Sequence, residues 1–184
     1  VYLFGHSMGG VMAPYVAKGT GARGAIVYGT LARSWMEYLL ENTRRQARLS
    51  GASEEEVTRL VLEQTRLVAP VLIDGKTVAD VWKAHPERKF DDPTYEPERI
   101  YGRHVKFFQE LQDLNLSQAW KDANVAVLAI HGEYDWVSPR DDHELIAAIA
   151  RRQPRGKASR FLELPQADHG FTRHDNHSTV WFHD

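Results

Sequence analysis

The stretch that decides the fold is Val1-Tyr-Leu-Phe-Gly-His-Ser-Met-Gly-Gly10. Its apolar beginning predicts the end of a buried strand, and residues 11–18, which follow it, favour a helix. Gly5, Ser7 and Gly9 form the pattern G-x-S-x-G, which is typical of a serine on a sharp turn between a strand and a helix. Such a turn strains the serine backbone. We expect that neither glycine tolerates a side chain, because the neighbouring backbones come very close.

Three more apolar runs indicate strands, and segments with helical spacing lie between them. The runs are residues 24–30, 124–131 and 160–164. Pro139 is expected to start the helix between the last two of them. Strands that alternate with helices predict a parallel α/β sheet.

The long segment between the second and third expected strands, residues 31–123, is charged and helical in pattern. A parallel crossover needs only about a dozen residues. Most of the segment is therefore an insertion, which we interpret as a helical cap or lid. The expected organisation is a core of residues 1–30 and 124–184, interrupted by this cap.

Helix signals recur within the cap. Ser53 with Glu56 predicts a capping box at the start of one helix, and Thr77 is expected to cap a shorter one. Apolar residues at helical spacing from Ile100 to Leu111 predict another. Prolines are expected at the joins between helices, and they are Pro70, Pro86, Pro93 and Pro97.

An acid and a histidine each follow one of the later strands. Asp135 ends the segment that begins at His131, and His169 lies in the loop after the last strand. The carboxyl ends of parallel strands meet at one edge of a sheet, where open α/β sheets build their sites. A serine hydroxyl is a weak nucleophile near neutral pH, so it needs a base, and a carboxylate must hold that imidazole in the correct tautomer. Ser7, His169 and Asp135 are therefore the predicted nucleophile, base and acid.

Other carboxylates are alternatives to Asp135. Asp141 and Asp142 are close to it in sequence, but they are typical of acids in the first turn of a helix. Asp168 is a poor candidate, because side chains adjacent in an extended loop usually diverge and Asp168 directly precedes His169.

Several histidines invite a metal interpretation. His169, His174, His177 and His183 lie near the end of the chain, but their spacing fits no compact zinc motif. We predict a solvated, histidine-rich tail, no metal and no cofactor. His6, directly before the serine, either lines a pocket or packs beneath the turn.

Composition narrows the partners. The chain has 184 residues, of which 42% are apolar, as expected for one globular domain. The formal net charge of −2 offers no basic surface to nucleic acid, and the apolar run 125–130 is too short to cross a bilayer. No cysteine is present, which excludes a thiol nucleophile. The chain begins inside a strand, and we interpret this as the loss of an upstream portion. A secretion signal therefore stays undetermined. The sequence does not determine the cellular location or the oligomeric state either.

The motifs Gly5-His-Ser-Met-Gly9, Gly132-Glu-Tyr-Asp135 and Asp168-His169-Gly170 resemble, in order and in strand context, the C-terminal half of a serine hydrolase of the α/β-hydrolase fold. The resemblance implies a parallel sheet that lacks its N-terminal strands here and a helical cap between the sixth and seventh strands. The cap is similar to that of the proline iminopeptidase, serine aminopeptidase and monoacylglycerol lipase branch. The resemblance also implies that the Met8 N–H is one oxyanion donor and that no cofactor takes part.

The resemblance further implies hydrolysis of a carboxylic ester, or of an amide or peptide bond, through an acyl-enzyme on Ser7. A cap acid that captures a substrate amine would favour a peptide, and the candidates are Glu37, Glu41 and Glu63. Acyl transfer to an alcohol and non-catalytic ligand binding are the alternatives. The family's second oxyanion donor is not among these residues, and losing one donor costs about 100- to 1000-fold in turnover. We therefore expect residues 1–184 alone to fold poorly and to be nearly inactive.

Overall fold

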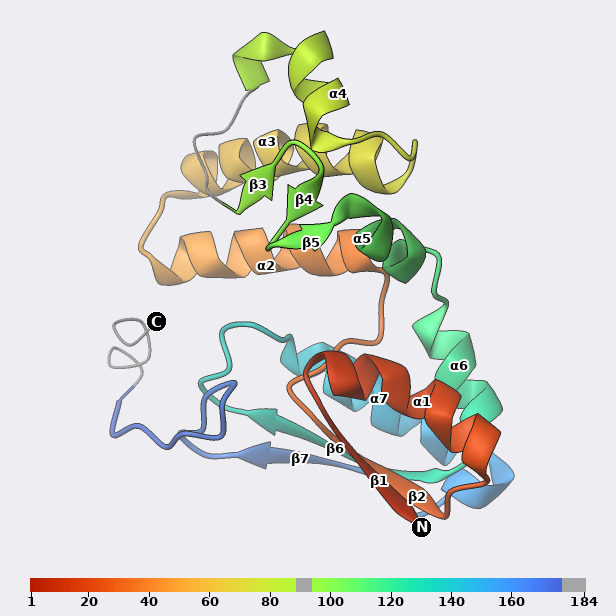
Figure 1. Ribbon diagram of the computed structural model, residues 1–184. Coiled ribbons are helices and arrows are strands. Elements are labelled where there is room, and N and C mark those ends of the chain that lie inside the picture. The colour runs from red at the N-terminus through yellow and green to blue at the C-terminus, as the bar shows by residue number, and fades with distance from the viewer. Residues whose placement is uncertain (89–93, 177–184) are drawn as a thin grey trace. The chain divides into compact units, whose positions relative to one another are not determined.

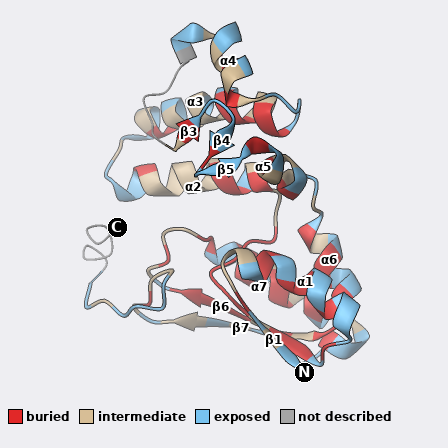
Figure 2. Ribbon diagram, in the orientation of Figure 1, coloured by how far each residue is buried: buried red, intermediate tan, exposed pale blue. Residues whose placement is uncertain are grey.

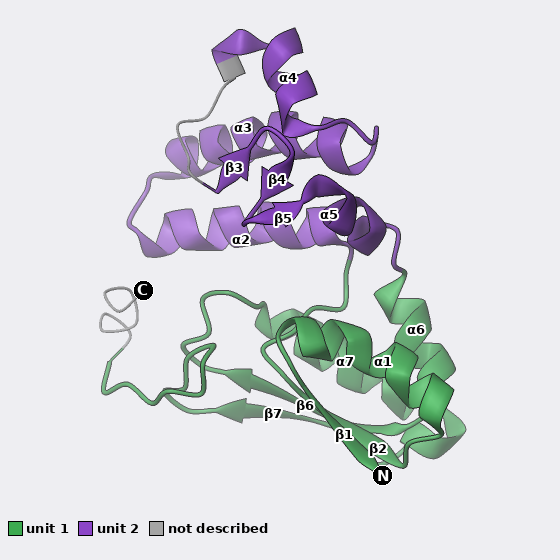
Figure 3. Ribbon diagram, in the orientation of Figure 1, with its two compact units in different colours: residues 1–33, 115–184 green, residues 34–114 purple. Residues whose placement is uncertain are grey.

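The computed structural model describes residues 1–88 and 94–176 of the chain (Figure 1). They form two compact units (Figure 3). The sheet unit contains residues 1–33 and the described residues from 115 onward, and the helical unit contains residues 34–114. Each unit has buried residues of its own (Figure 2).

The sheet unit contains the predicted parallel sheet. Its four strands lie in the order β1-β2-β6-β7, and they are Tyr2–His6, Gly24–Tyr28, Ala126–Gly132 and Arg160–Leu164. His6 pairs with Tyr28, and Tyr28 pairs with Ile130, so the carboxyl ends of neighbouring strands are level. The loops that follow these strands therefore start from one edge of the sheet.

Helices cover one face of this sheet (Figure 1). They are α1 (Met8–Thr20), α6 (Leu116–Ala123) and α7 (Arg140–Arg151), and the short 3₁₀ helix η2 (Pro154–Gly156) leads on towards β7. The helix α7 begins directly after Pro139, as predicted. Val27 and Val127 lie in one buried cluster with Trp120 and Ile146. Burial of this apolar surface stabilises the packing of the helices on the sheet. The packing holds the strand ends, and the loops that follow them, in place.

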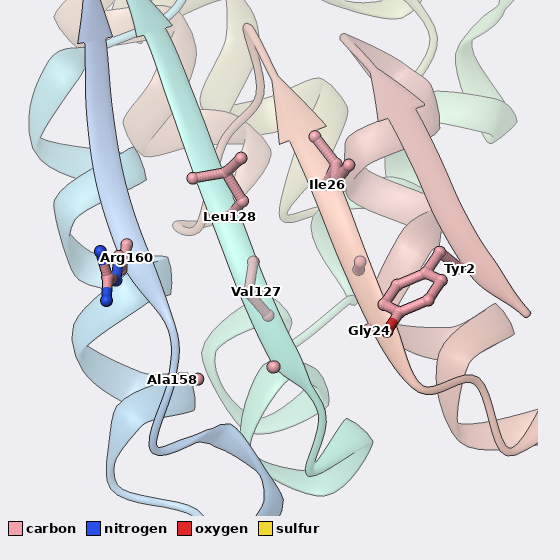
Figure 4. A pocket seen from close by; sticks show the side chains of 9 residues that line it. Tyr2, Gly24, Ile26, Val127, Leu128, Ala158 and Arg160 are labelled. Atoms are coloured by element: carbon pink, nitrogen blue, oxygen red, sulfur yellow. The ribbon is translucent and has the colours of Figure 1, made fainter.

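The opposite face of the sheet is open in the part of the chain that the structure describes. Tyr2 is 70% exposed there and Phe4 is 63% exposed. A hollow of about 310 Å³ lies on this face. Figure 4 shows the side chains that line it, which include Ile26 and Leu128. The hollow extends to the amino ends of the strands. The predicted catalytic residues follow the carboxyl ends, so the hollow is a separate feature.

The helical unit combines helices with a small antiparallel sheet. The helices are α2 (Trp35–Leu49), α3 (Glu54–Leu72), α4 (Val78–Ala84), the 3₁₀ helix η1 (Pro86–Arg88) and α5 (Val105–Gln112). The strands β3 (Tyr95–Glu96), β4 (Arg99–Ile100) and β5 (Arg103–His104) pair antiparallel. Trp35 packs against Tyr38 and Phe108, with ring centroids 4.8 and 5.4 Å apart. Within the two described stretches, no helix has both the length and the apolar character needed to cross a membrane.

The helical unit is narrower than the cap expected over residues 31–123. Residues 31–33 and the helix α6 belong to the sheet unit. The reason is packing, because α6 lies against α1 and α7 and buries Trp120 and Ala123 in the sheet unit's core. The apolar spacing of α6 is that of any amphipathic helix, so the sequence pattern could not assign it to one unit.

Residues 100–104 are not helical, contrary to the expectation for Ile100–Leu111. They contribute to β4 and β5, and α5 begins only at Val105. His104 ends the strand and also caps the helix, because its Nδ1 accepts the Lys106 N–H at 3.2 Å. Strands of two residues are too short to show the alternation on which strand prediction depends.

Two other expectations for the helical unit are corrected in detail. Ser53 accepts the Glu56 N–H at 3.2 Å, but the Glu56 carboxylate pairs with Arg59, so only half of the capping box forms. Pro70 lies inside α3 and not at its end, because a proline near the last turn removes a single N–H donor and the Ile73 N–H still bonds to Ala69 at 2.8 Å. Pro93 lies outside the described residues. The cap at Thr77 is confirmed, as a complete capping box with Asp80.

Candidate active site

The turn between β1 and α1 holds Ser7 in a strained backbone conformation. Its φ is 52° and its ψ is −120°, a combination that costs a non-glycine residue about 1–3 kcal/mol. A Cβ built on Gly5 would lie 2.6 Å from the Gly9 carbonyl oxygen, so the turn closes only because Gly5 has no side chain. The Ser7 N–H donates to the Tyr28 carbonyl oxygen at 3.0 Å. This bond ties the turn to the neighbouring strand.

Gly9 was also expected to be crowded, but the described residues leave space beside it. Apart from its two chain neighbours and the backbone of its own helix, no atom among residues 1–88 and 94–176 lies within 4 Å of a Cβ built on Gly9. The second crowded position is Gly10, whose Cβ would lie 2.5 Å from the side chain of Thr30. The helix α1 therefore approaches the loop after β2 through Gly10. Two adjacent glycines in a sequence do not reveal which of them is crowded.

The amino end of α1 leaves polar groups without a partner in the helix. Ser7 is its N-cap residue, yet the hydroxyl makes no capping hydrogen bond. The Ser7 carbonyl oxygen accepts the Gly10 N–H at 2.9 Å. The Met8 N–H belongs to the first turn, where N–H groups have no acceptor within a helix. Such groups, together with the helix dipole, stabilise negative charge, so the Met8 N–H suits an oxyanion.

Asp135 lies in a loop directly after β6 and is buried, at 5% exposed. Its Oδ1 accepts the N–H groups of Val137 and Ser138, both at 2.9 Å. Its Oδ2 accepts the Ser138 hydroxyl. These three donors hold the carboxylate in one orientation.

His169 meets this carboxylate from the loop after β7. Its Nδ1 lies 3.0 Å from Asp135 Oδ2 and 3.1 Å from Oδ1. With the proton on Nδ1, donated to the carboxylate, the imidazole has an unprotonated Nε2. Burial raises the pKa of Asp135, but the hydrogen bond and charge of His169 and the bonds from Ser138 outweigh it, and the net pKa is lowered. The acid is therefore ionised beside the imidazole.

Gly29 makes room for this pair. It follows β2 with a φ of +58°, and a Cβ built on it would lie 2.9 Å from the His169 ring and 3.2 Å from Asp135 Oδ2. Glycine alone avoids both the steric conflict and the left-handed strain. The sequence shows Gly29 only as the end of a strand, with no signal that it faces an imidazole.

The structure brings the three predicted residues to one edge of the sheet. Asp135 and His169 are in contact, and the Ser7 backbone is bonded to Tyr28, which directly precedes Gly29. No hydrogen bond joins the Ser7 hydroxyl to His169 in the described part of the chain. Catalytic hydrogen bonds are often long in ligand-free proteins and shorten only in complexes with substrate.

The alternative carboxylates serve other purposes. Asp142 is 1% exposed, and it accepts the Ala32 N–H at 3.0 Å and pairs with Arg33 Nε at 3.2 Å. Asp168 accepts the N–H groups of Gly170 and Thr172, both at 2.8 Å. These contacts shape loops around the site.

A metal site is not formed by the histidines that the structure describes. His169 is occupied with Asp135, and His174 Nε2 lies 2.6 Å from Asp168 Oδ2. Within residues 1–88 and 94–176, no three potential ligand side chains converge as a metal ion requires. His177 and His183 lie outside the described residues.

Sequence reasoning missed His143, a fully buried histidine beneath the site. Its Nε2 accepts the Thr30 N–H at 3.0 Å, and its Nδ1 donates to the Pro139 carbonyl oxygen at 2.9 Å. The ring therefore joins the loop after β2 to the start of α7. Burial is the main cause that lowers the pKa of His143 from 6.5 to about 4. The sequence shows a histidine at this position but does not show that its side chain is buried, so no signal marked it.

The pKa of His143 predicts how stability depends on pH. Between pH 6.5 and about 4, the unfolded chain binds a proton that the folded chain does not. The free energy of unfolding should therefore fall as the pH falls through this interval, by up to about 1.4 kcal/mol per pH unit from this group. Below about pH 4 both states are protonated, and this contribution stops changing.

Denaturant unfolding at a series of pH values, for the parent protein and for His143→Gln, measures this contribution. Glutamine does not titrate, so the variant should lose part of the slope between pH 6.5 and 4. The matched control is His85→Gln, because the His85 side chain is 44% exposed. Equal slopes in the parent and in His143→Gln would contradict the prediction.

The acids considered for capturing a substrate amine have partners within the helical unit. Glu37 completes a capping box with Ser34 at the start of α2. Glu41 pairs with Arg45 at 3.1 Å, and Glu63 pairs with Arg59 at 2.6 Å. An amine would have to compete with these contacts.

The sequence and the structure were compared with those of known proteins. A family model with the description "Alpha/beta hydrolase family" matches residues 1–180. A search of curated protein sequences finds no match.

Similar solved structures include a thermophilic esterase from Thermogutta terrifontis, which is 24% identical with a TM-score of 0.47, over 92% of this chain and 57% of that one. The monoacylglycerol lipase of Paleococcus ferrophilus is 18% identical with a TM-score of 0.48, over 97% of this chain and 64% of that one. The esterase domain of a Rhodothermus marinus protein is 18% identical with a TM-score of 0.48, over 98% of this chain and 56% of that one. This chain therefore spans less than two thirds of the length of each.

Proposed function

Because this chain belongs to the alpha/beta hydrolase family, we propose that it is a serine hydrolase that cleaves carboxylic esters through an acyl-enzyme on Ser7. One observation carries the proposal. A serine on a strained turn shares a sheet edge with an imidazole whose Nδ1 lies 3.0 Å from a buried carboxylate. The strained turn exposes the serine Oγ, and an oriented imidazole is the base that a hydroxyl nucleophile needs.

In the first half of the reaction, Ser7 Oγ attacks the ester carbonyl carbon while His169 Nε2 accepts the hydroxyl proton. The carbonyl π electrons move to the oxygen, and the Met8 N–H stabilises the resulting oxyanion. When the carbonyl re-forms, the bond to the leaving alkoxide breaks, and His169 returns the proton to that oxygen. The products are an alcohol and an ester of Ser7 with the acyl group.

In the second half, a water molecule attacks the acyl-enzyme, and His169 accepts one of its protons. The new oxyanion collapses, the bond between the acyl carbon and Ser7 Oγ breaks, and His169 returns the proton to the serine oxygen. A carboxylic acid leaves. Asp135 stays ionised throughout, in keeping with its lowered pKa, and stabilises the imidazolium in each half.

The engaged state of the cap acids supports an ester over a peptide substrate. An aminopeptidase needs a carboxylate that is free to bind the substrate amine, whereas Glu37, Glu41 and Glu63 already cap a helix or pair with arginines. In this proposal the helical unit acts as the cap that selects the acyl or alcohol group. Selectivity of this kind depends on the shape of a pocket and not on the triad.

A fluorophosphonate probe tests the proposal on the complete gene product. The probe phosphonylates only an activated serine, and mass spectrometry locates the adduct. After trypsin, Ser7 lies in a peptide that ends at Lys18, and it is the one serine between residues 1 and 18. We expect the adduct on this peptide in native protein and its loss after heat denaturation. An adduct elsewhere would mean that another residue is the nucleophile, and a folded protein that does not react would favour a non-catalytic relative. A labelled protein that forms new esters with added alcohols would favour acyl transfer.

A further inference from the structure

The loop that carries His169 is anchored to the sheet by two side chains outside the proposed triad. His6 is the last residue of β1, and its Nε2 lies 2.7 Å from the His169 carbonyl oxygen. Tyr28 is the last residue of β2, and its hydroxyl donates to the Asp168 carbonyl oxygen. Two successive carbonyl groups of the loop are thus bound from two adjacent strands.

The loop is also stiff in itself. The Asp168 carboxylate accepts two N–H groups of the loop, from Gly170 and Thr172, and contacts His174. The Asp168 N–H donates to the Thr172 carbonyl oxygen at 2.9 Å. A loop that is closed on itself in this way moves as one body, so its place relative to the sheet depends on its external anchors.

Aromatic packing supports the two anchors. Phe171 stacks on Tyr28 with ring centroids 3.5 Å apart, and the His6 ring lies 5.0 Å from the His169 ring. Burial is the main cause that raises the pKa of Tyr28 far above its ordinary value, and the charges of Asp135 and Asp168 raise it further. The tyrosine hydroxyl therefore stays protonated and remains a donor.

We propose that His6 and Tyr28 are positioning residues that set the distance between His169 and Ser7. The inference rests on the proposed function. His6 directly precedes Ser7, so one residue of the turn presents the nucleophile while its neighbour holds the base. Of the two roles expected for His6, pocket lining or packing beneath the turn, its hydrogen bond to the His169 carbonyl oxygen supports a structural one.

The test compares variants in the complete gene product, with a p-nitrophenyl ester as substrate. Tyr28→Phe removes one hydroxyl, and His6→Leu removes the ring donor. Each should lower kcat about 10-fold, the double variant about 100-fold, and KM should change less than about 2-fold. His6→Gln places an amide N–H near the position of Nε2 and should restore most of the loss. The matched control is Tyr2→Phe, because Tyr2 is 70% exposed.

Three results would each overturn the inference. The first is an unchanged kcat in Tyr28→Phe and His6→Leu, and the second is an equal loss of kcat in Tyr2→Phe. The third is a kcat of His6→Gln as low as that of His6→Leu. A second measurement is independent of turnover: solvent exchange of the His169 Nδ1 proton, followed by NMR. We expect faster exchange in Tyr28→Phe than in the parent, and equal exchange would overturn the inference. If the parent neither hydrolyses the ester nor reacts with a fluorophosphonate, the proposed function fails, and the exchange rates then decide whether the two side chains anchor the loop.

Discussion

Ser7→Ala is expected to lower kcat for ester hydrolysis about 10⁶-fold. The substitution removes the oxygen that forms the acyl-enzyme, so His169 and Asp135 have no nucleophile to activate. The residual rate over water would come from binding and oxyanion stabilisation alone. Steady-state kinetics with a p-nitrophenyl ester measure the loss, and rapid mixing should show that the initial burst of p-nitrophenol disappears with it.

The matched control is Ser53→Ala. Ser53 caps α3 in the helical unit, so its loss should cost about 1 kcal/mol of stability and leave kcat within about 2-fold of the parent. Circular dichroism of both variants separates unfolding from loss of chemistry. If Ser7→Ala were folded and kept more than about 1% of the parent activity, another residue would be the nucleophile.

Asp135→Asn is expected to lower kcat about 10⁴-fold. The amide is nearly the same size as the carboxylate, but it removes the negative charge that stabilises the imidazolium. Its NH₂ group also opposes the Nδ1–H of His169 and favours the wrong tautomer, with the proton on Nε2. The change should appear in kcat measured with the ester, and the protein should fold, because the amide oxygen can still accept the N–H groups of Val137 and Ser138.

Asp141→Asn is the control for this substitution, because Asp141 is an exposed acid in the first turn of α7. It should keep kcat within about 2-fold of the parent. A harmless Asp135→Asn would mean that a different acid orients the histidine. Activity that rises again at high pH in Asp135→Asn would support the tautomer argument, since hydroxide can accept the serine proton that the protonated Nε2 of His169 cannot.

The sheet could be predicted from the sequence because its signals are local. Apolar runs bounded by glycine or proline mark β1, β2, β6 and β7, and the alternation with helices makes the sheet parallel. The contact between Asp135 and His169 followed from the same information, because both residues come directly after strands that end at one edge.

The rest depends on contacts between distant residues. His6 and His169 are 163 positions apart, and Tyr28 and Asp168 are 140 apart. No local pattern joins such pairs. The crowding at Gly10 in place of Gly9 depends on where Thr30 lies, and the assignment of α6 to the sheet unit depends on which surface covers Trp120. Both results depend on packing in three dimensions, which the spacing of apolar residues along the sequence does not encode.

Gly29 has a consequence in genetic terms. Every missense change of a single base in a glycine codon introduces a residue with a Cβ, and a Cβ at this position would lie 2.9 Å from the His169 ring. Each single-base change that replaces Gly29 should therefore reduce the activity, and selection on the activity would remove it. In a population, variation at this codon should be confined to its third base.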